Sequence, residues 1–205
     1  MSWTYYRSMA VKRAAHRPSR KHEIVAAALR LYASRPRESI AVADIAAESK
    51  MTAAALYYHY ATKEEILLHG LTSFADAFAA EASVYLKSDD AAVHNLVVHL
   101  VDWMHDHRDA AAVWFAHSNG LSTAVEAVRR TTNENILGDV IKAVRRAKPQ
   151  YPLPHASVIA AALMAQIDVC ARAWWTNDEQ CSGVCEDDFR AAVADLSARI
   201  INTPI

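Results

Sequence analysis

The chain has 205 residues, 53% of them apolar, which is enough for one large or two small domains with a sizeable core. Four glycines, sparse prolines and clustered alanines favour an all-α protein. Three cysteines cannot all pair, and we find no apolar run near the ~20 residues that span a bilayer and no signal segment. A disulfide scaffold and a membrane protein are therefore disfavoured, and we expect a cytoplasmic protein.

The formal net charge of −1 is unevenly distributed along the chain. Residues 1–68 hold eleven Lys or Arg against six Asp or Glu, whereas the remainder holds eleven against seventeen. Residues 1–22 carry six basic residues and no acid. A basic front end on an acidic body is expected of a polyanion-binding domain joined to another domain. A solvated tail with incidental charge explains residues 1–22 equally well.

The N-terminal third predicts a flexible arm followed by three helices. Residues 1–18 have no apolar period and are expected to form a basic arm. A helix is predicted from residue 19 or 20 to residue 34, where Arg35-Pro36 ends it. Two short helices follow, over residues 42–48 and 52–59, with a three-residue turn between them. This arrangement is typical of a helix-turn-helix, and we assign residues 19–66 to it.

The rest of the chain predicts a larger helical domain, residues 67–205. Thr62 is placed to cap a long helix that runs to about residue 86, with Glu65 completing a capping box. Further helices are predicted from residues 88–90 to 104, then over 109–118, 122–147, 155–175 and 186–201. The chain is therefore expected to contain about nine helices.

Three segments carry a resemblance to a known family. VADIA at residues 42–46, MT at 51–52 and LYYHYATKEEIL at 56–67 together resemble the DNA-binding signature of TetR-family transcriptional regulators. The resemblance implies an all-helical, homodimeric repressor without catalytic activity or a cofactor. Its N-terminal domain would bind a double-stranded DNA operator, and its C-terminal domain would bind a small-molecule inducer.

The residues around the second short helix suggest how DNA would be held. Thr52 caps this helix where a phosphate would lie, and exposed phenol, imidazole and ammonium groups follow it. Lysine in the first turn of the next helix conflicts with the helix dipole unless it meets an outside anion, and Lys63 resembles the family's phosphate-contacting lysine. Leu56 and Tyr60 are interpreted as core. The predicted DNA contacts are Lys50, Thr52, Ala53, Ala55, Tyr57, Tyr58, His59, Lys63 and Arg17.

Three departures from the family pattern bear on this interface. Lys50 stands where glycine is usual, so a left-handed backbone there would cost roughly 1 kcal/mol. The alanines at 53 and 55 offer methyl groups to thymine but donate no hydrogen bond. We therefore expect sparse base contacts and a larger share for DNA shape, with Arg17 reaching a minor groove.

Large aromatic and a few polar side chains collect within residues 90–175, as a pocket between helices requires. For any single one of them, ordinary core is the better explanation, and Trp174 and Trp175 could belong to a subunit interface instead. The predicted ligand-binding residues are Trp103, His107, Trp114, His117, Met164 and Trp174. The aromatic content points to an apolar or aromatic inducer, either an acyl thioester or a flat ring compound.

The last two helices are too apolar to face solvent on all sides. We predict that two such helices from each of two subunits form a four-helix bundle, with burial inside one subunit as the alternative. The residues on which this prediction depends are Ala160, Ala161, Ala165, Ile167, Phe189, Val193, Leu196 and Ile200.

Other functions find less support in the sequence. The histidines and the Cys181/Cys185 pair lack the partners of a zinc set, so no metal is predicted. The alternative from another class is a helical-bundle ligand-binding protein or enzyme whose basic front end is incidental.

Overall fold

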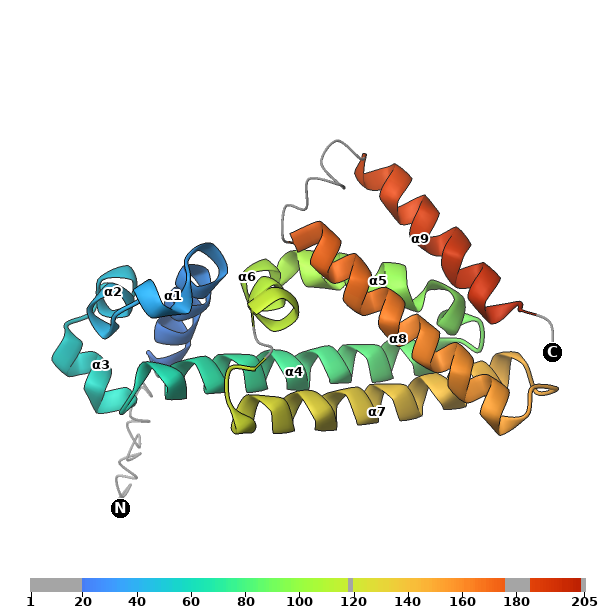
Figure 1. Cartoon of the computed structure of the whole chain (residues 1–205), viewed down its shortest axis with the longest axis horizontal. Coiled ribbons are helices and arrows are strands. Elements are labelled where there is room, and N and C mark those ends of the chain that lie inside the picture. Colours follow the sequence, from blue (N-terminus) through green and yellow to red (C-terminus); the bar gives the residue numbers. More distant parts are fainter. Residues whose placement is uncertain (1–19, 118–119, 176–184, 204–205) are drawn as a thin grey trace, which may run out of the picture.

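The computed structural model describes residues 20–117, 120–175 and 185–203, and all the regular structure in this part of the chain is helical. The predicted all-α fold is confirmed. Three helices at one end of the molecule and a larger group at the other end are joined by one long helix, α4 (Figure 1). The predicted arm, residues 1–18, lies outside the described residues, and the proposed domain boundary at residue 66 stays a prediction.

The small group consists of α1 (Lys21–Ser34), the 3-10 turn η1 (Arg37–Ser39), α2 (Val42–Glu48) and α3 (Ala53–His59). Helix α1 ends as expected, because Arg35 before the proline is extended. Ile24, Ile45 and Leu56 are completely buried and hold the three helices together. The helix-turn-helix predicted from spacing is therefore present, with each helix within two residues of its expected bounds.

Helix α4 (Lys63–Ser88) connects this group to the body and packs along α1 at one end and α7 along its length. Its apolar stripe is buried as the sequence indicates, with Leu67, Leu71, Phe74 and Phe78 all in the core. Gly70 lies where α1 crosses, and a Cβ there would come within 3.0 Å of the Val25 side chain. The glycine therefore sets how closely α1 approaches α4.

The body continues with η2 (Ala92–Asn95), α5 (Leu96–Asp106), α6 (Arg108–Ala112), η3 (Val113–His117), α7 (Thr123–Ala147), α8 (Leu153–Trp175) and α9 (Glu186–Ile201). Helix α7 lies beside α4, and α8 packs on α7, α5 and α9 (Figure 1). One continuous apolar core links the first helix to the last.

Two helix predictions need correction. The helix expected to open at residues 88–90 instead begins as the 3-10 turn η2 and becomes α-helical at Leu96, because the Asp89 side chain accepts the N–H of Ala91 at 2.9 Å and ends α4. The helix expected over residues 109–118 splits into α6 and the single π-helical turn η3. A π-turn shifts the side chains that follow it to a new face.

The stripe on α9 that was predicted to pair two subunits mostly packs within one. Val193 is 5% exposed, Phe189 and Ile200 are half-buried against the core, and only Leu196, at 49%, is largely exposed. Buried hydrogen bonds fix this face, since Gln166 on α8 donates to the Val193 carbonyl and accepts from Ser197. The alternative of burial inside one subunit therefore holds for most of this stripe.

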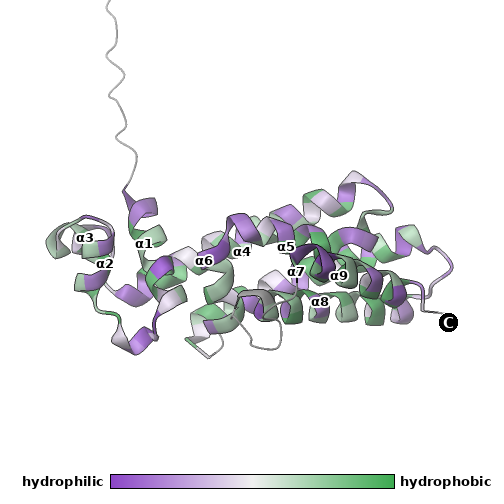
Figure 2. Cartoon of the chain, turned by 90° about the horizontal axis from the view of Figure 1, so that it is seen from above, coloured by the Kyte–Doolittle hydropathy of each residue, from purple (hydrophilic) through white to green (hydrophobic). Residues whose placement is uncertain are grey.

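The expectation that no apolar run approaches bilayer length is also wrong. Residues Leu153–Ala173 of α8 are long and apolar enough to cross a membrane by composition, with mean hydropathy 1.4. Buried residues make up 44% of that window, and α8 packs on three neighbouring helices, which is the position of a core helix. Figure 2 shows its hydrophobic character clearly.

Candidate nucleic-acid interface and ligand cavity

The turn between α2 and α3 is a Schellman motif with lysine at its left-handed position. Lys50 has φ 54°, its N–H donates to Ala47 at 3.0 Å, and the N–H of Met51 donates to Ala46 at 2.8 Å. The left-handed backbone expected at Lys50 is therefore confirmed. The side chain is exposed, so the turn carries a positive charge on its outer surface.

Helix α3 begins with the predicted cap. The Thr52 hydroxyl accepts the N–H of Ala55 at 3.2 Å, and Thr52 and Ala53 are exposed, whereas Ala55 is half-buried. The first N–H groups of a helix have no partner within the helix and can be donated to an outside anion. The open start of α3 therefore suits a phosphate.

The two tyrosines of α3 point away from the core. Tyr57 is 54% exposed and Tyr58 is 86% exposed, whereas Leu56 and Tyr60 are at most 3% exposed, as the sequence indicates. His59 is half-buried and meets Tyr58 edge to face at 5.4 Å. The helix thus divides into one face that anchors it and one that offers phenol groups to a partner.

Lys63 does not point freely outward in this structure. Its ammonium group donates to the carbonyls of Ile40 at 2.6 Å and Arg37 at 3.3 Å. An ammonium group has three donors, so one remains for a phosphate, and that contact stays a prediction. The cap beside it is confirmed in part: Thr62 accepts the N–H of Glu65, but Glu65 reaches back to Ala61 rather than to Thr62.

The described interface residues therefore share one end of the molecule, where α3 lies farthest from α9 (Figure 1). Arg17 lies outside the described residues. The assignment of individual DNA contacts remains a prediction for every residue of the set.

A cavity of about 680 Å³ lies in the body between α4, η3, α7 and α8. Phe78, Trp114 and Phe115 supply its aromatic surface. Arg129 of α7 crosses the indole of Trp114 at 5.0 Å and donates to its carbonyl at 2.6 Å. Burial lowers the pKa of Arg129, and nearby Glu126 opposes that shift. The cavity is thus aromatic on one side and charged on the other.

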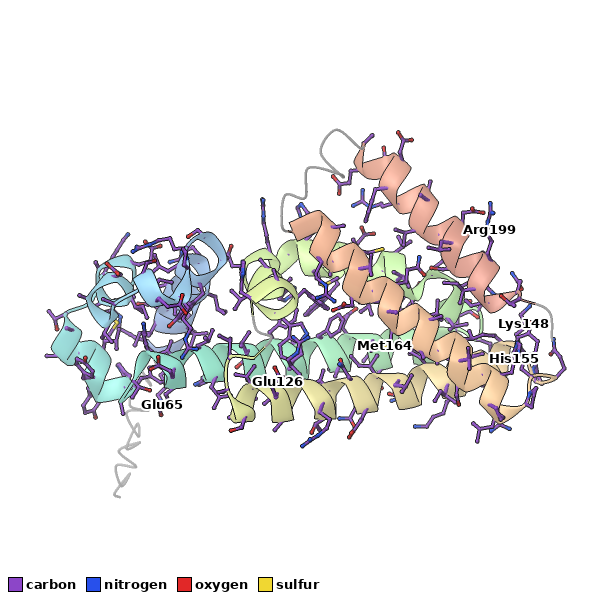
Figure 3. The ribbon with its side chains drawn as sticks, viewed as in Figure 1. Glu65, Glu126, Lys148, His155, Met164 and Arg199 are labelled. Atoms are coloured by element: carbon purple, nitrogen blue, oxygen red, sulfur yellow. The ribbon has the colours of Figure 1, made fainter. Side chains whose placement is uncertain are left out.

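Two of the predicted pocket residues line this cavity, Trp114 and Met164. Figure 3 labels Met164 on α8 and Glu126 on α7, which both belong to its wall. Trp103 and His107 instead stack on each other at 3.8 Å and are not among its lining residues. His117 lines a separate cavity, and the side chain of Trp174 lies outside the described part.

Sequence reasoning missed the polar wall that α7 contributes. Its members recur every three or four residues, which places them on one helix face beside the buried stripe. That spacing was the available signal, but their polarity made the face look solvated. These residues are Glu126, Arg129, Arg130, Asn133 and Glu134, and the apolar Leu137 follows them on the same face.

No group of three metal-ligating side chains occurs among the residues that the structure describes. Cys170 is buried on α8 and Cys185 is exposed at the start of α9, while Cys181 falls outside the described ranges.

The chain thus combines a helix-turn-helix that has an exposed aromatic face with an all-helical body that contains a cavity, and α4 joins the two. Residues 24–69 match the family described as bacterial regulatory proteins, tetR family. By this match, the helix-turn-helix and the start of α4 are similar to the DNA-binding domain of TetR-family transcriptional regulators. Comparison with curated protein sequences gives no match.

Solved structures share the fold over nearly the whole chain. The fatty acid degradation regulator FadR from Bacillus halodurans has a TM-score of 0.74 at 13% identity, covering 90% of this chain and 96% of that one. FadR from Bacillus subtilis, in complex with stearoyl-CoA, has a TM-score of 0.70 at 13% identity, and the match covers 90% of this chain and 99% of that one. A transcriptional regulator from Rhodococcus sp. Rha1 has a TM-score of 0.72 at 20% identity, and the match covers 88% of this chain and 95% of that one.

Proposed function

We propose that this regulator is a homodimeric, ligand-responsive repressor that acts in the cytoplasm and has no catalytic role. Its two α3 helices would bind two operator half-sites about one DNA turn apart. A small molecule in the body cavity would change their separation and release the operator. The observation that carries this proposal is α4, one helix of 26 residues that starts beside α3 and lines the cavity at Phe78.

DNA binding can be tested on the most exposed residue of the interface. Tyr58 is 86% exposed, so Tyr58→Phe removes a phenol hydroxyl without disturbing the core. Together with Lys63→Gln, it should weaken binding to the upstream region of its own gene at least tenfold in fluorescence anisotropy. Tyr85→Phe, on α4 in the body, is the matched control. An undiminished affinity of the double variant would refute the interface.

Sequence-specific binding needs a separate measurement. Affinity for the same upstream fragment and for a random duplex should be compared as salt is raised. The nonspecific part falls steeply with salt, so a specific regulator keeps its preference for the fragment. Equal loss on both duplexes would favour an architectural DNA binder instead.

The homodimer is supported by an exposed apolar face on α8. Val158 is 70% exposed and Val169 is 62% exposed, and the exposed Ala161 and Ala165 lie between them at helical spacing. On α9, Leu196 is also exposed, at 49%. Aliphatic residues on one helix face indicate an interaction surface when they are contiguous. We propose that this face of α8, with the exposed part of α9, pairs with its copy across a two-fold axis.

Charge placed on that face should separate the subunits. Val169→Glu is expected to convert dimer to monomer in size-exclusion chromatography with light scattering, because a buried unpaired carboxylate is costly. Val84→Glu is the matched control, since Val84 is 68% exposed on α4 and lies outside the proposed face. A dimer that persists in Val169→Glu would overturn the assignment, and so would a dimer that is lost in Val84→Glu.

The inducer is proposed to occupy the 680 Å³ cavity, where three arginines stand among three carboxylates opposite the aromatic wall. The arginines would suit an apolar molecule that carries an anionic group. An acyl thioester fits this description, and stearoyl-CoA is bound by a relative of the same fold. A flat aromatic acid is the second candidate.

A thermal-shift panel of acyl-CoA esters and flat aromatic acids would rank the two ligand classes. Asn133→Phe narrows the cavity and should abolish the shift, whereas Asn135→Phe on the same helix lies outside it and should not. Equal shifts in both variants would place the ligand elsewhere.

A further inference from the structure

A second cavity lies at the joint between the helix-turn-helix and the body. It measures about 470 Å³ and is separate from the cavity between α7 and α8. Its walls come from the end of α1 and the loop after it, from Leu67 of α4, from Val113 and His117 of η3 and from Leu121 before α7. Anything bound there would touch both parts of the molecule.

Tyr32, which lines the cavity, has a buried hydroxyl without a partner. Tyr32 is 4% exposed, and its hydroxyl has no hydrogen-bond partner in the structure. Burial raises the pKa of Tyr32 to about 12, with Glu64 adding to the shift and Arg37 opposing it. The hydroxyl is therefore protonated near neutral pH and available as a donor. Buried polar groups in native proteins are nearly always paired, so an unpaired one in a cavity wall points to a ligand.

A guanidinium group on the same wall is held by long contacts. Arg37 reaches Glu64 on α4 at 3.3 Å and the carbonyl of Leu121 at 3.4 Å, both beyond the usual N–H···O range. Its side chain is 32% exposed, and the group has five donors. Arg35 lines the same cavity and donates to the Ser39 carbonyl at 2.9 Å, while Glu38 is a carboxylate on the wall.

We propose that this joint cavity binds a small organic carboxylate with an apolar body. The carboxylate accepts from the guanidinium of Arg37 and from the hydroxyl of Tyr32. The apolar part lies against Leu67, Val113 and Leu121. Planar, bidentate recognition of a carboxylate is the contact to which arginine is best suited.

A ligand in the joint cavity would change the contacts between the helix-turn-helix and the body. Arg37 connects the loop after α1 with α4 and with the backbone before α7, so it is a contact between the two parts of the chain. A carboxylate that engages Arg37 competes with Glu64 and Leu121. The site therefore adds an input to the orientation of the helix-turn-helix that does not depend on the body cavity.

The probe is 3-phenylpropionate, with neutral 3-phenylpropionamide as its isostere. Ligand-observed NMR titrations on the full chain without DNA give the dissociation constants. The acid should bind about tenfold or more tightly than the amide, because hydrogen bonds to charged groups are the strong ones. Arg37→Gln should weaken binding of the acid about tenfold, and Tyr32→Phe about threefold to tenfold.

Matched controls separate this site from the rest of the molecule. Arg30→Gln, whose partner is Glu48 outside the cavity, and Tyr85→Phe should leave the affinity unchanged. Asn133→Phe, which narrows the body cavity, should also leave it unchanged. Tyr32→Phe keeps the ring in the core, so this variant still tests the site if the Arg37→Gln protein does not fold.

Three results would overturn the proposal. One is equal binding of acid and amide, and another is wild-type affinity in Tyr32→Phe. The third is loss of binding in Asn133→Phe alone, which would place the probe in the body. Because no DNA is present, failure here is distinguishable from failure of the repressor assignment.

Discussion

Replacing Lys50 by glycine should stabilise the protein, because the residue has a backbone conformation that suits glycine. Its φ of 54° lies in the left-handed region, and both hydrogen bonds of the Schellman motif depend on it. An L-residue in that region costs about 1–2 kcal/mol. Glycine avoids this cost but loses about 0.4–1 kcal/mol through the greater freedom of the unfolded chain. The midpoints of these two ranges leave a net gain in unfolding free energy of about 0.8 kcal/mol.

Thermal unfolding by circular dichroism measures this gain. For a chain of this size the expected rise in Tm is about 1–4 °C, at equal protomer concentration. Lys50→Ala removes the same amino group but keeps the Cβ, so its Tm should stay near that of the wild type. If Lys50→Ala raised the Tm as much as Lys50→Gly, the charge and not the backbone would be responsible.

The same two variants report on DNA binding. Both variants lose one positive charge per subunit from the outer surface of the turn, so a phosphate contact by Lys50 would reduce the salt slope of binding by the proposed dimer by about 1.8 in each variant, which is about 0.9 for each subunit. Any further difference in DNA affinity between Lys50→Gly and Lys50→Ala arises from the backbone conformation of the turn. Unchanged slopes in both variants would remove Lys50 from the predicted DNA contacts.

Four other changes test separate parts of the structure. Thr52→Ala should cost about 1 kcal/mol in urea unfolding and weaken DNA binding, whereas Thr52→Ser keeps the cap; equal stability would contradict the capping bond. Gly70→Leu should cost about 1–3 kcal/mol, because its Cβ already meets Val25 at 3.0 Å, and wild-type stability would disprove this close approach. Trp114→Ala should cost about 3 kcal/mol in the same assay, at the low end for tryptophan since one side borders a cavity; a loss below about 1 kcal/mol would show that the indole is not core. The pKa of Tyr32 is about 12 in the folded protein and about 10 in the unfolded chain, so the stability that depends on its protonated hydroxyl is fully present below pH 10 and is lost as the pH rises from 10 to 12. Over that range the free energy of unfolding should fall less in Tyr32→Phe than in the wild type, by on the order of 2 kcal/mol, and equal losses in both proteins would refute the shift.

The sequence predicted the parts of the fold that depend on neighbouring residues. Caps at Thr52 and Thr62, the stop before Pro36 and the left-handed turn at Lys50 all follow from local backbone chemistry, and all are present. Helix existence was also predictable, because long apolar stripes at helical spacing have few alternatives.

What the sequence could not predict depends on contacts between distant segments. The inward bonds of Lys63 need the carbonyls of Arg37 and Ile40, which are more than twenty positions away. The close approach at Gly70 depends on α1, and the indoles of Trp103 and Trp114, which come from different elements, meet the same ring of Phe74. Periodicity along one helix carries no information about any of these partners.

These distant contacts also explain how a small change in the body could reach the operator. Phe78 at the body cavity and Lys63 beside α3 are separated by about 22 Å of rigid helix, at 1.5 Å per residue. A tilt of about 10° at Phe78 would therefore move the Lys63 end by roughly 4 Å, which exceeds the reach of a hydrogen bond. Because α1 packs on α4 around Gly70, the helix-turn-helix would move with that end as one body. If the protein acts as the dimeric repressor proposed above, its two half-sites on DNA accept a single spacing, and a shift of this size in each subunit would be sufficient to break the proposed phosphate contacts without unfolding any helix.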